Sequence, residues 1–390
     1  MDGTERTVSA RLAGAMADID AADWDAIANP PGQPYDPFVS HAFLDLLEKS
    51  GSARHETGWQ PAHILLEDDD ETGAPRLIAA APAYAKQHSY GEYVFDHAWA
   101  DAFERAGGQY YPKLQTCVPF TPAPGRRFLC ADRSLVEPLA ASAAKLAARV
   151  GVSSYHATFC TEEEWSALGE IGYLKRMDQQ FHWENDGYAT FEDFLAALSS
   201  RKRKNLKKER AAALEDGIEI EWVTGSEIGE HHWDAFFRFY MDTGSRKWGT
   251  PYLTRTFFSL LGERMADDVL LIFAKREGRY IAGALNLIGS EALYGRNWGC
   301  TEHVPFLHFE VCYYQAIDYA LAHGLKYVEA GAQGGHKLAR GYRPVTTRSA
   351  HWIAHPGLRA AISDYLARER QAVSRDQDYL AERTPFKKGE

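Results

Sequence analysis

Two ionisable residues, His308 and Glu310, lie where a helix is expected to begin. Apolar residues recur at helical spacing over 306–323, and a glycine follows. The Glu310 carboxylate in this position can act as a general base and take a proton from an incoming ammonium group, and His308 can assist or orient it. The helix dipole alone also favours a carboxylate in the first turn, with the imidazole packed beside it. The residue pattern is compatible with both interpretations.

A second pair, Glu329 and His336, lies at and after the end of a short predicted strand, 326–330. Polar side chains just beyond a strand end often form binding sites, and these two could be a base and its orienting partner. Alternatively, Glu329 forms a structural ion pair with one of the cations that follow it. We expect the helix start and this strand end to face each other across one cleft.

Further residues near the two pairs could bind the reacting molecules. Cations after the strand could clamp a phosphate or a carboxylate, because arginine offers a planar fork of donors. The predicted substrate-binding residues are Trp298, Tyr314, Gln333, Lys337, Arg340 and Arg343. The aromatic members of this set could equally belong to the core. A metal site built from His303, His308 and His336 is not expected, because no HExxH or paired-histidine spacing supports it.

A dense basic run, 201–210, lies within a predicted helix over 191–214. Seven of its ten residues are Arg or Lys, in a chain whose net charge is −11. We predict that Arg201, Lys204 and Lys208 contact tRNA or another polyanion through their charge. A solvated helix face is the ordinary explanation of such a run. The negative net charge argues against a bulk attraction to nucleic acid or to an anionic membrane.

Composition excludes several classes of protein. The 390 residues are 45% hydrophobic and 25% charged, which is typical of a globular chain with two or three domains. The five cysteines are odd in number and form no CxxC pair, so a disulfide framework or a zinc ribbon is not expected. No apolar run approaches the ~18 residues that a spanning helix needs, and no signal peptide is recognisable. We therefore expect a cytoplasmic protein without a membrane span or a metal.

The order of elements repeats between the two halves of the chain. Each half is expected to run helix, three strands, loop, helix and strand, with negligible sequence identity between the halves. In the second half the predicted strands are 269–275, 280–288 and 292–300. This order resembles the layout of GNAT-type acyltransferases. The layout implies splayed strands beside the helix, whose unpaired backbone groups can bind an extended pantetheine or peptide arm.

Eight short stretches, in order along most of the chain, resemble the FemAB-like family of tandem-GNAT acyltransferases, often described as peptidoglycan biosynthesis/recognition proteins. They are WADA (99–102), YYPKLQ (110–115), PFTPAPGRR (119–127), QFHW (180–183), SRKRKNLKKER (200–210), LHFEVCYYQ (307–315), GAQGGHKLARGY (331–342) and SAHWI (349–353). One position departs from the family pattern. Gly335 stands where the family usually has a glutamate, so any chemical role of that glutamate is missing here or is supplied from elsewhere.

The resemblance implies an α/β (α+β) fold of two tandem GNAT-like domains, each a mixed, mostly antiparallel sheet flanked by helices. A basic helix would join the two domains. The expected ranges are 1–187 for the N-terminal domain, 188–214 for the basic helix, 215–355 for the C-terminal domain and 356–390 for a C-terminal helix and tail.

The resemblance also implies an acyltransferase that moves an acyl or aminoacyl group from a thioester or an aminoacyl-tRNA to an amine. The acceptor would be a small molecule or a peptide, such as a peptidoglycan precursor, with acyl-CoA or aminoacyl-tRNA as co-substrate and no resident cofactor. Gly125, Arg126 and Arg127 lie where such enzymes hold a pyrophosphate, although an ordinary Pro/Gly turn fits the same letters. A non-catalytic protein that binds a peptide or a cell-wall fragment on this scaffold is the alternative.

Overall fold

The computed structural model describes residues 8–69, 73–247, 251–331 and 334–387, without the side chains of 245–247. The chain divides into two compact units. Unit 1 contains Met1–Asp178 and Thr347–Val373, and unit 2 contains Gln179–Thr346 and Ser374–Glu390. The boundaries therefore fall inside two long strands, β9 (Leu174–Glu184) and β15 (Arg343–Ile353), and inside the last helix, α12 (Pro356–Ala381).

These units differ from the predicted domain ranges. The predicted C-terminal domain ended at residue 355, whereas Thr347–Val373 belongs to unit 1. The reason is the pairing of β15, because Ser349–Ile353 forms an antiparallel ladder with β8 (Ser154–Thr158). Linear boundaries cannot describe a chain that returns to its first unit near its end.

Unit 1 contains two sheets and several helices. One sheet has the strand order β1-β3-β4-β7, and the other runs from β15 through β8, β6 and β5 to β2. The further strands are β1 (Val8–Ala13), β2 (Trp59–Pro61), β3 (His63–Asp69), β4 (Pro75–Ala81), β5 (Ala83–Lys86), β6 (Lys113–Thr116) and β7 (Leu129–Cys130). The helices are α1 (Ala21–Ala28), α2 (His41–Lys49), α3 (His97–Arg105), α4 (Val136–Val150), α5 (Glu162–Glu170) and most of α12.

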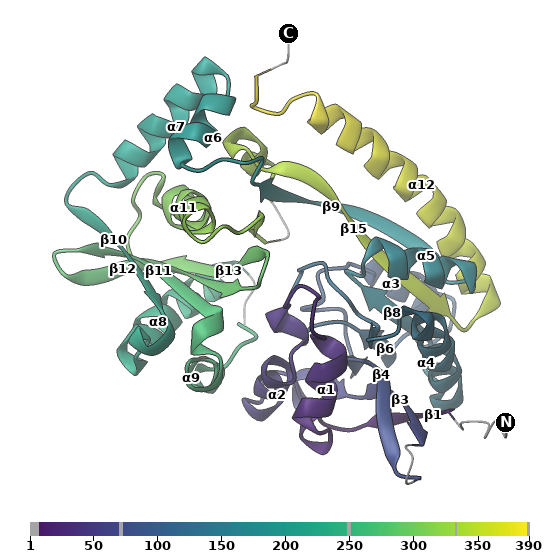
Figure 1. The fold of residues 1–390 in the computed structure, drawn as a ribbon. Helices are drawn as coiled ribbons and strands as arrows, with labels where there is room; N and C mark the ends of the chain where they lie inside the picture. The colour runs from purple at the N-terminus through teal and green to yellow at the C-terminus, as the bar shows by residue number, and fades with distance from the viewer. Residues whose placement is uncertain (1–7, 70–72, 248–250, 332–333, 388–390) are drawn as a thin grey trace. The chain divides into compact units, whose positions relative to one another are not determined.

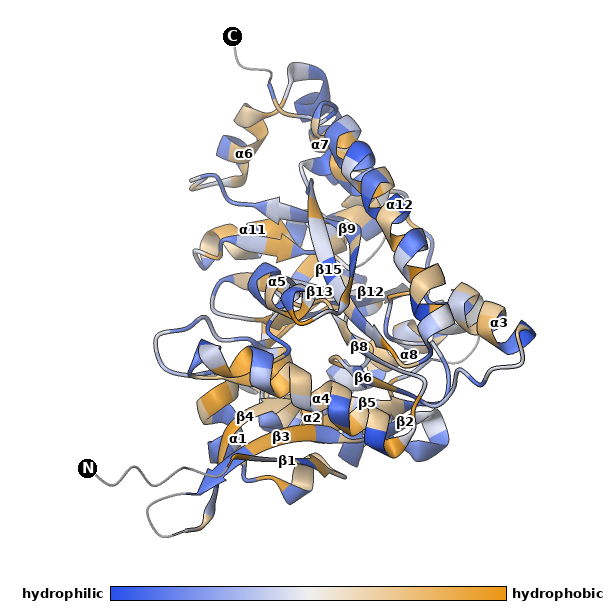
Figure 2. Ribbon diagram, turned by 90° about the vertical axis from the view of Figure 1, so that its right-hand side faces the viewer, coloured by the Kyte–Doolittle hydropathy of each residue, from blue (hydrophilic) through white to orange (hydrophobic). Residues whose placement is uncertain are grey.

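Local sequence explains the main elements of unit 1. The β3 and β4 strands are rich in Ile, Leu and Ala and are largely apolar in Figure 2. The alanine-rich helix α4 buries Leu139, Ala143 and Leu146 in the same core as these strands. Side-chain caps start the neighbouring helices, as in α2, where the Ser40 hydroxyl accepts from the Phe43 N–H.

Unit 2 has one sheet with the order β10-β11-β12-β13-β14-β9. Its strands are β10 (Ile218–Thr224), β11 (Val269–Arg276), β12 (Arg279–Ile288), β13 (Ala292–Cys300), β14 (Tyr327–Glu329) and the end of β9. Its helices are α6 (Phe191–Ala197), α7 (Ser200–Ala213), α8 (Glu230–Lys247), α9 (Arg255–Arg264), α10 (Leu307–Phe309) and α11 (Gln315–Ala322). Helix α11 covers one face of the strands, and α8 and α9 lie on the other face (Figure 1).

Two predicted helices of unit 2 are interrupted. The predicted helix 191–214 is two helices, because the backbone of Leu198 is extended, with φ −80° and ψ 154°. The predicted helix 306–323 is one helical segment with a π-helical turn at Glu310–Tyr314, between α10 and α11. This π turn inserts an extra residue into the helix and therefore changes which side chains face the sheet.

Some local structure was not anticipated from the sequence. Residues 92–96 form an irregular loop before α3, which begins at His97. The strand β9 was not predicted. The three strands β11, β12 and β13 lie within one residue of their predicted ranges.

Candidate functional site

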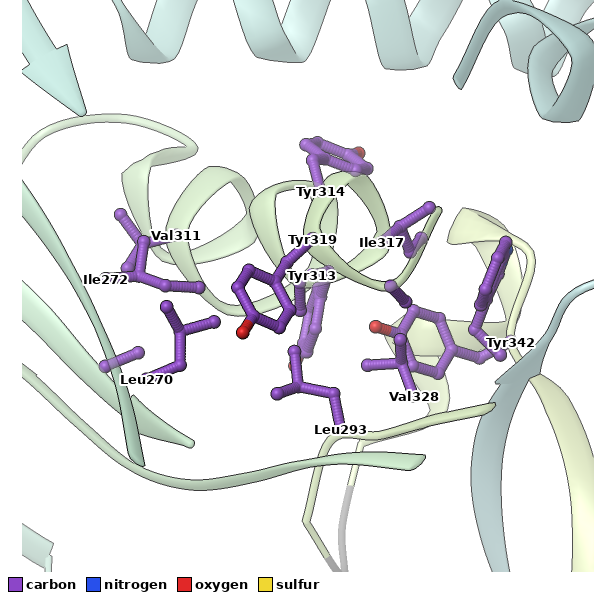
Figure 3. Close-up of a cluster of buried hydrophobic side chains, with 14 of the residues drawn as sticks. Leu270, Ile272, Leu293, Val311, Tyr313, Tyr314, Ile317, Tyr319, Val328 and Tyr342 are labelled. Atoms are coloured by element: carbon purple, nitrogen blue, oxygen red, sulfur yellow. The ribbon is translucent and has the colours of Figure 1, made fainter. Parts of the chain in front are cut away.

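The helical segment α10–π turn–α11 packs on the sheet of unit 2. Val311 and Ile317 belong to a core that includes Leu270 and Leu293 from the strands. Figure 3 shows Tyr313 on the side of the helix that faces Leu293, and Tyr314 on the opposite side. The two consecutive tyrosines of the π turn therefore have different surroundings.

Five rings form a cluster at the start of this segment, which we call the aromatic–histidine cluster. Its members are Trp298, His308, Phe309, Tyr313 and His336. The His308 ring lies 5.2 Å from Trp298 and 6.2 Å from His336, measured between centroids. The Tyr313 hydroxyl and His336 Nε2 are 2.8 Å apart, a hydrogen-bond distance. The helix start and the residues after β14 therefore come together through their histidines.

The environment of the cluster controls its protonation and its shape. Burial raises the pKa of Tyr313, so its hydroxyl stays protonated at neutral pH. His336 is exposed, so solvent or a ligand can reach it. The Arg340 guanidinium lies 3.4 Å from the centroid of the Phe309 ring and donates to the His336 carbonyl at 2.8 Å. Arg340 thus supports the loop that carries His336 and has no open face for a phosphate.

Glu310 does not belong to this cluster. It is fully buried, and its carboxylate accepts two hydrogen bonds from Arg210 of α7, at 2.8 and 3.1 Å. The Gln315 side-chain amide donates to the same carboxylate at 2.7 Å. The predicted general base is therefore an ion-paired interior group, and this geometry does not suit direct contact with an acceptor amine.

Glu329, at the end of β14, and Lys337, in the loop that carries His336, lie near each other. The Glu329 carboxylate is 3.8 Å from His182 Nδ1 on β9. Burial, with a further contribution from Lys337, lowers the pKa of His182 to about 3, so this imidazole is neutral. Burial also lowers the pKa of Lys337 to about 8, although Cys312 and Glu329 oppose the change. Lys337 donates to the Gly331 carbonyl at 2.7 Å, so it is an interior group of the loop.

The remaining predicted binding residues have different surroundings. Tyr314 is buried and its hydroxyl donates to Glu209, so it cannot line an open site. Arg343 forms surface ion pairs with Glu184 and Asp186. Trp298 lies in the cluster next to His308. Gln333 lies outside the described residues.

The strands beside the cluster separate. β13 and β14 pair in parallel only at Ala292–Tyr294 and Tyr327–Glu329, where β14 ends, whereas β13 continues to Cys300. Just beyond this point the pairing of β13 with β12 shifts by one residue, so that Leu285 pairs with Asn297 and Asn286 pairs with Gly295. Trp298 is on this continuing part of β13.

The predicted pyrophosphate loop of unit 1 is occupied by internal bonds. The Gly125 N–H donates to the Phe159 carbonyl at 3.0 Å. The N–H groups of Arg127 and Phe128 donate to the Glu164 carboxylate. The Arg127 guanidinium is buried and donates to backbone carbonyls, and Arg126 donates to the Ala28 carbonyl. These donors hold the loop itself, so they do not form a phosphate cradle.

The basic run on α7 divides into two groups. Arg201, Lys204 and Lys208 are exposed, and no carboxylate within the described part of the chain pairs with them at 4.0 Å or less. Lys207 pairs with Glu192, and Arg210 is the partner of Glu310. Arg201, Lys204 and Lys208 are the cations that were predicted to contact a polyanion.

Sequence reasoning missed a buried charged network in unit 1. Lys113 Nζ lies 2.6 Å from both Glu92 and Asp96, and Lys86 pairs with Glu92 at 3.1 Å. Charge from Lys113 lowers the pKa of Asp96, against the effect of burial. Lys113 is the lysine of YYPKLQ, but nothing in a β-prone stretch indicates that its lysine is interior.

Comparison with known proteins agrees with this fold. The model of the FemAB-like family, described as peptidoglycan biosynthesis/recognition, matches residues 15–388, so the chain belongs to this family. No curated protein sequence matches it. The crystal structure of FemX is similar with a TM-score of 0.54 and 13% identity, over 88% of this chain and 98% of that chain.

A second similar structure is the C-terminal domain of a putative lysylphosphatidylglycerol synthetase from Agrobacterium fabrum. Its TM-score is 0.54 at 9% identity, over 90% of this chain and 97% of that chain. L-PGS from Bacillus licheniformis has a TM-score of 0.50 at 9% identity, over 86% and 98%. The predicted fold of two tandem GNAT-like domains is confirmed.

Two further predictions concern features of the whole chain. Among the described helices, none combines the length and the apolar character that crossing a membrane requires. No group of three or more His, Cys, Asp or Glu side chains suited to a metal ion occurs in the described part of the chain.

Proposed function

We propose that the protein transfers an acyl or aminoacyl group from a thioester or an aminoacyl-tRNA to an amine, and that the reaction takes place in unit 2. The observation that carries the proposal is the position of the aromatic–histidine cluster beside the strand ends that separate. An extended donor arm could pair with the backbone of β13 beyond Tyr294, as an added strand. Its reactive carbonyl would then lie near Trp298 and the two histidines.

In this proposal His336 is the general base. The amine nitrogen attacks the donor carbonyl carbon, and His336 takes the proton that the nitrogen loses. The carbon–sulfur or carbon–oxygen bond of the donor then breaks, and the thiol or the ribose hydroxyl leaves with the proton that the His336 imidazolium returns. A hydrogen bond from Nε2–H to the Tyr313 oxygen would place the imidazole lone pair on Nδ1. His308, 6.2 Å away between centroids, would bind the acceptor or assist the leaving group.

Glu310 and Glu329 take supporting roles in the proposal. Glu310 is enclosed by Arg210 and Gln315, and Glu329 lies against His182 and near Lys337. This replaces the prediction that a carboxylate is the base. The FemAB-like family and the similarity to a putative lysylphosphatidylglycerol synthetase support an aminoacyl or acyl group as cargo and a peptide-like or lipid-like acceptor.

The exposed cations of α7 favour aminoacyl-tRNA over acyl-CoA as donor. Arg201, Lys204 and Lys208 lie within a few turns of one helix, and a tRNA offers phosphates along its length. Binding of tRNA should weaken steeply with salt, and changing the three residues to alanine should flatten that dependence. Salt-insensitive stabilisation by an acyl-CoA alone would instead identify acyl-CoA as the donor.

The experiment combines binding with product analysis. A thermal-shift panel of CoA, acyl-CoAs, aminoacyl-tRNAs and muropeptides identifies ligands, since a ligand of the folded state raises the melting temperature. The acceptor is then analysed by mass spectrometry for a gain of one acyl group. We expect His336→Ala to slow transfer by about 10²–10⁴-fold, the range of a general base, and Arg255→Ala to have no effect. Equal rates in His336→Ala would refute the proposed base.

A non-catalytic binding protein is the second candidate. The observation in its favour is that neither predicted catalytic glutamate is an open carboxylate, since Glu310 is sealed and Glu329 is half-buried. Gly335 also stands where the family usually carries a glutamate. A muropeptide that raises the melting temperature, without any mass gain in the presence of every donor, would favour this function.

A further inference from the structure

Two adjacent residues of the basic helix, Glu209 and Arg210, contact the two parts of the site in unit 2. The Arg210 guanidinium binds Glu310 of the π turn at 2.8 Å and Asp318 of α11 at 2.6 Å. The Glu209 carboxylate binds Arg340 in a two-bond pair at 3.0 and 3.1 Å. It also accepts from the Tyr314 hydroxyl. One point on α7 thus holds both the helical segment and the loop.

The contacts of Arg210 stabilise the π turn. Gln315 donates to Glu310 across five positions, which is the spacing of a π turn, and Arg210 closes the other side of the carboxylate. Without these bonds the segment could return to α-helical register. If the turn became α-helical, the side chains before it would rotate by ~100° about the helix axis relative to those after it. Tyr313 would then no longer meet His336.

The contacts of Glu209 stabilise the loop. Arg340 is almost fully buried and is held by Glu209 at one end, while its NH1 group donates to the His336 carbonyl at 2.8 Å. Its guanidinium also stacks on Phe309 of the helix start. Loss of Glu209 would leave a buried guanidinium without its carboxylate, directly beneath the backbone of His336.

We propose that Glu209 and Arg210 are positioning residues, which fix the hydrogen bond between the Tyr313 hydroxyl and His336 Nε2. The effect of these residues on the reaction rate rests on the proposed function. Their effect on the hydrogen bond between Tyr313 and His336 can be measured without turnover. It gives the basic run two roles: the exposed cations contact a polyanion, and its last two residues hold the site. A buried ion pair contributes little net stability compared with apolar side chains of the same size. The role we assign to these two residues is therefore to select one conformation of the site.

The test observes His336 directly by NMR. Protein labelled at the Cε1 carbon of histidine is titrated with acid, and His336→Gln identifies the signal. Glu209→Gln keeps the shape of the side chain and removes its charge. We expect it to move the His336 titration midpoint by ~0.5 pH unit, about the effect of one hydrogen bond. Tyr313→Phe should give a similar shift, and the double variant should add little to either.

The matched control is Arg255, which also binds two carboxylates, Glu230 and Asp234, but on the surface of α8 and α9. Arg255→Gln should leave the His336 signal unchanged. Arg210→Gln should move it, and if this variant does not fold, Glu209→Gln decides alone. An unchanged His336 signal in a folded Glu209→Gln protein would overturn the proposal.

A kinetic measurement separates this inference from the proposed function. If transfer is observed, Glu209→Gln should lower kcat while KM stays within about twofold, because the part of β13 proposed to pair with the donor is untouched. If no donor and acceptor pair reacts, the proposed function fails, whereas the NMR result still decides whether these residues position His336.

Discussion

Removal of the Arg210 guanidinium should cost unit 2 a large part of its stability. Glu310 is fully buried, and in Arg210→Ala its carboxylate would keep Gln315 as its one side-chain partner among the described residues. Breaking a buried ion pair in this way costs ~3–5 kcal/mol. Each kcal/mol lowers the melting temperature of a unit of about 185 residues by roughly 2–4 °C, so we expect a decrease of about 6–20 °C.

Differential scanning calorimetry is the suitable assay, because the two units can unfold in separate transitions. The matched control is Arg255→Ala, which removes a surface arginine whose partners are mostly exposed and should cost ~0.2–1 kcal/mol. Replacing both members of the buried pair, with Arg210→Met and Glu310→Leu, should recover much of the loss, because no buried charge remains. A loss below about 1 kcal/mol in Arg210→Ala would refute the buried pair.

Three further predictions concern other parts of the chain. Gly335→Glu should fold with an unchanged melting temperature, because a Cβ there meets no atom within 4 Å; if the family glutamate assists His336, transfer should become faster. Lys86→Met should remove a gain in stability of ~3 kcal/mol between pH 8 and 10.5. Burial lowers the pKa of Lys86 to about 8, so the folded state favours the neutral amine and the free energy of unfolding increases as the pH rises. Urea titrations of both proteins at each pH measure this free energy. Changing Arg201, Lys204 and Lys208 to alanine should alter the free energy of unfolding by at most about 0.5 kcal/mol per residue. It should lower the salt slope of tRNA binding by about one per residue, which filter binding at several salt concentrations would show.

The sheet of unit 2 was predictable because its strands carry a strong local signal. β11, β12 and β13 are rich in apolar and β-prone residues and are separated by short turns, such as Glu277-Gly278 with positive φ at both residues. The helical segment after them was predictable as a helix. Its π turn was not, because a single inserted residue barely changes the hydrophobic pattern of residues 306–323.

The candidate site was predictable in part. The spacing placed His308 at a helix start and His336 after a strand end, and these two do meet. The same spacing placed Glu310 beside His308, yet the π turn and an arginine 100 residues earlier bury it. A sequence shows that a carboxylate starts a helix, but its partner from a distant helix decides whether that carboxylate meets water.

The basic run shows why composition alone misleads about function. Seven cations in ten positions suggest one continuous basic surface, and such a run is unusual in a chain with a net charge of −11. In the fold, Lys207 pairs with Glu192 and Arg210 is committed to Glu310 and Asp318, so only part of the run can attract a polyanion. Glu209, which the charge pattern ignores, contacts both Arg340 and Tyr314. The helix is therefore better understood as a support for the site whose outer face remains basic.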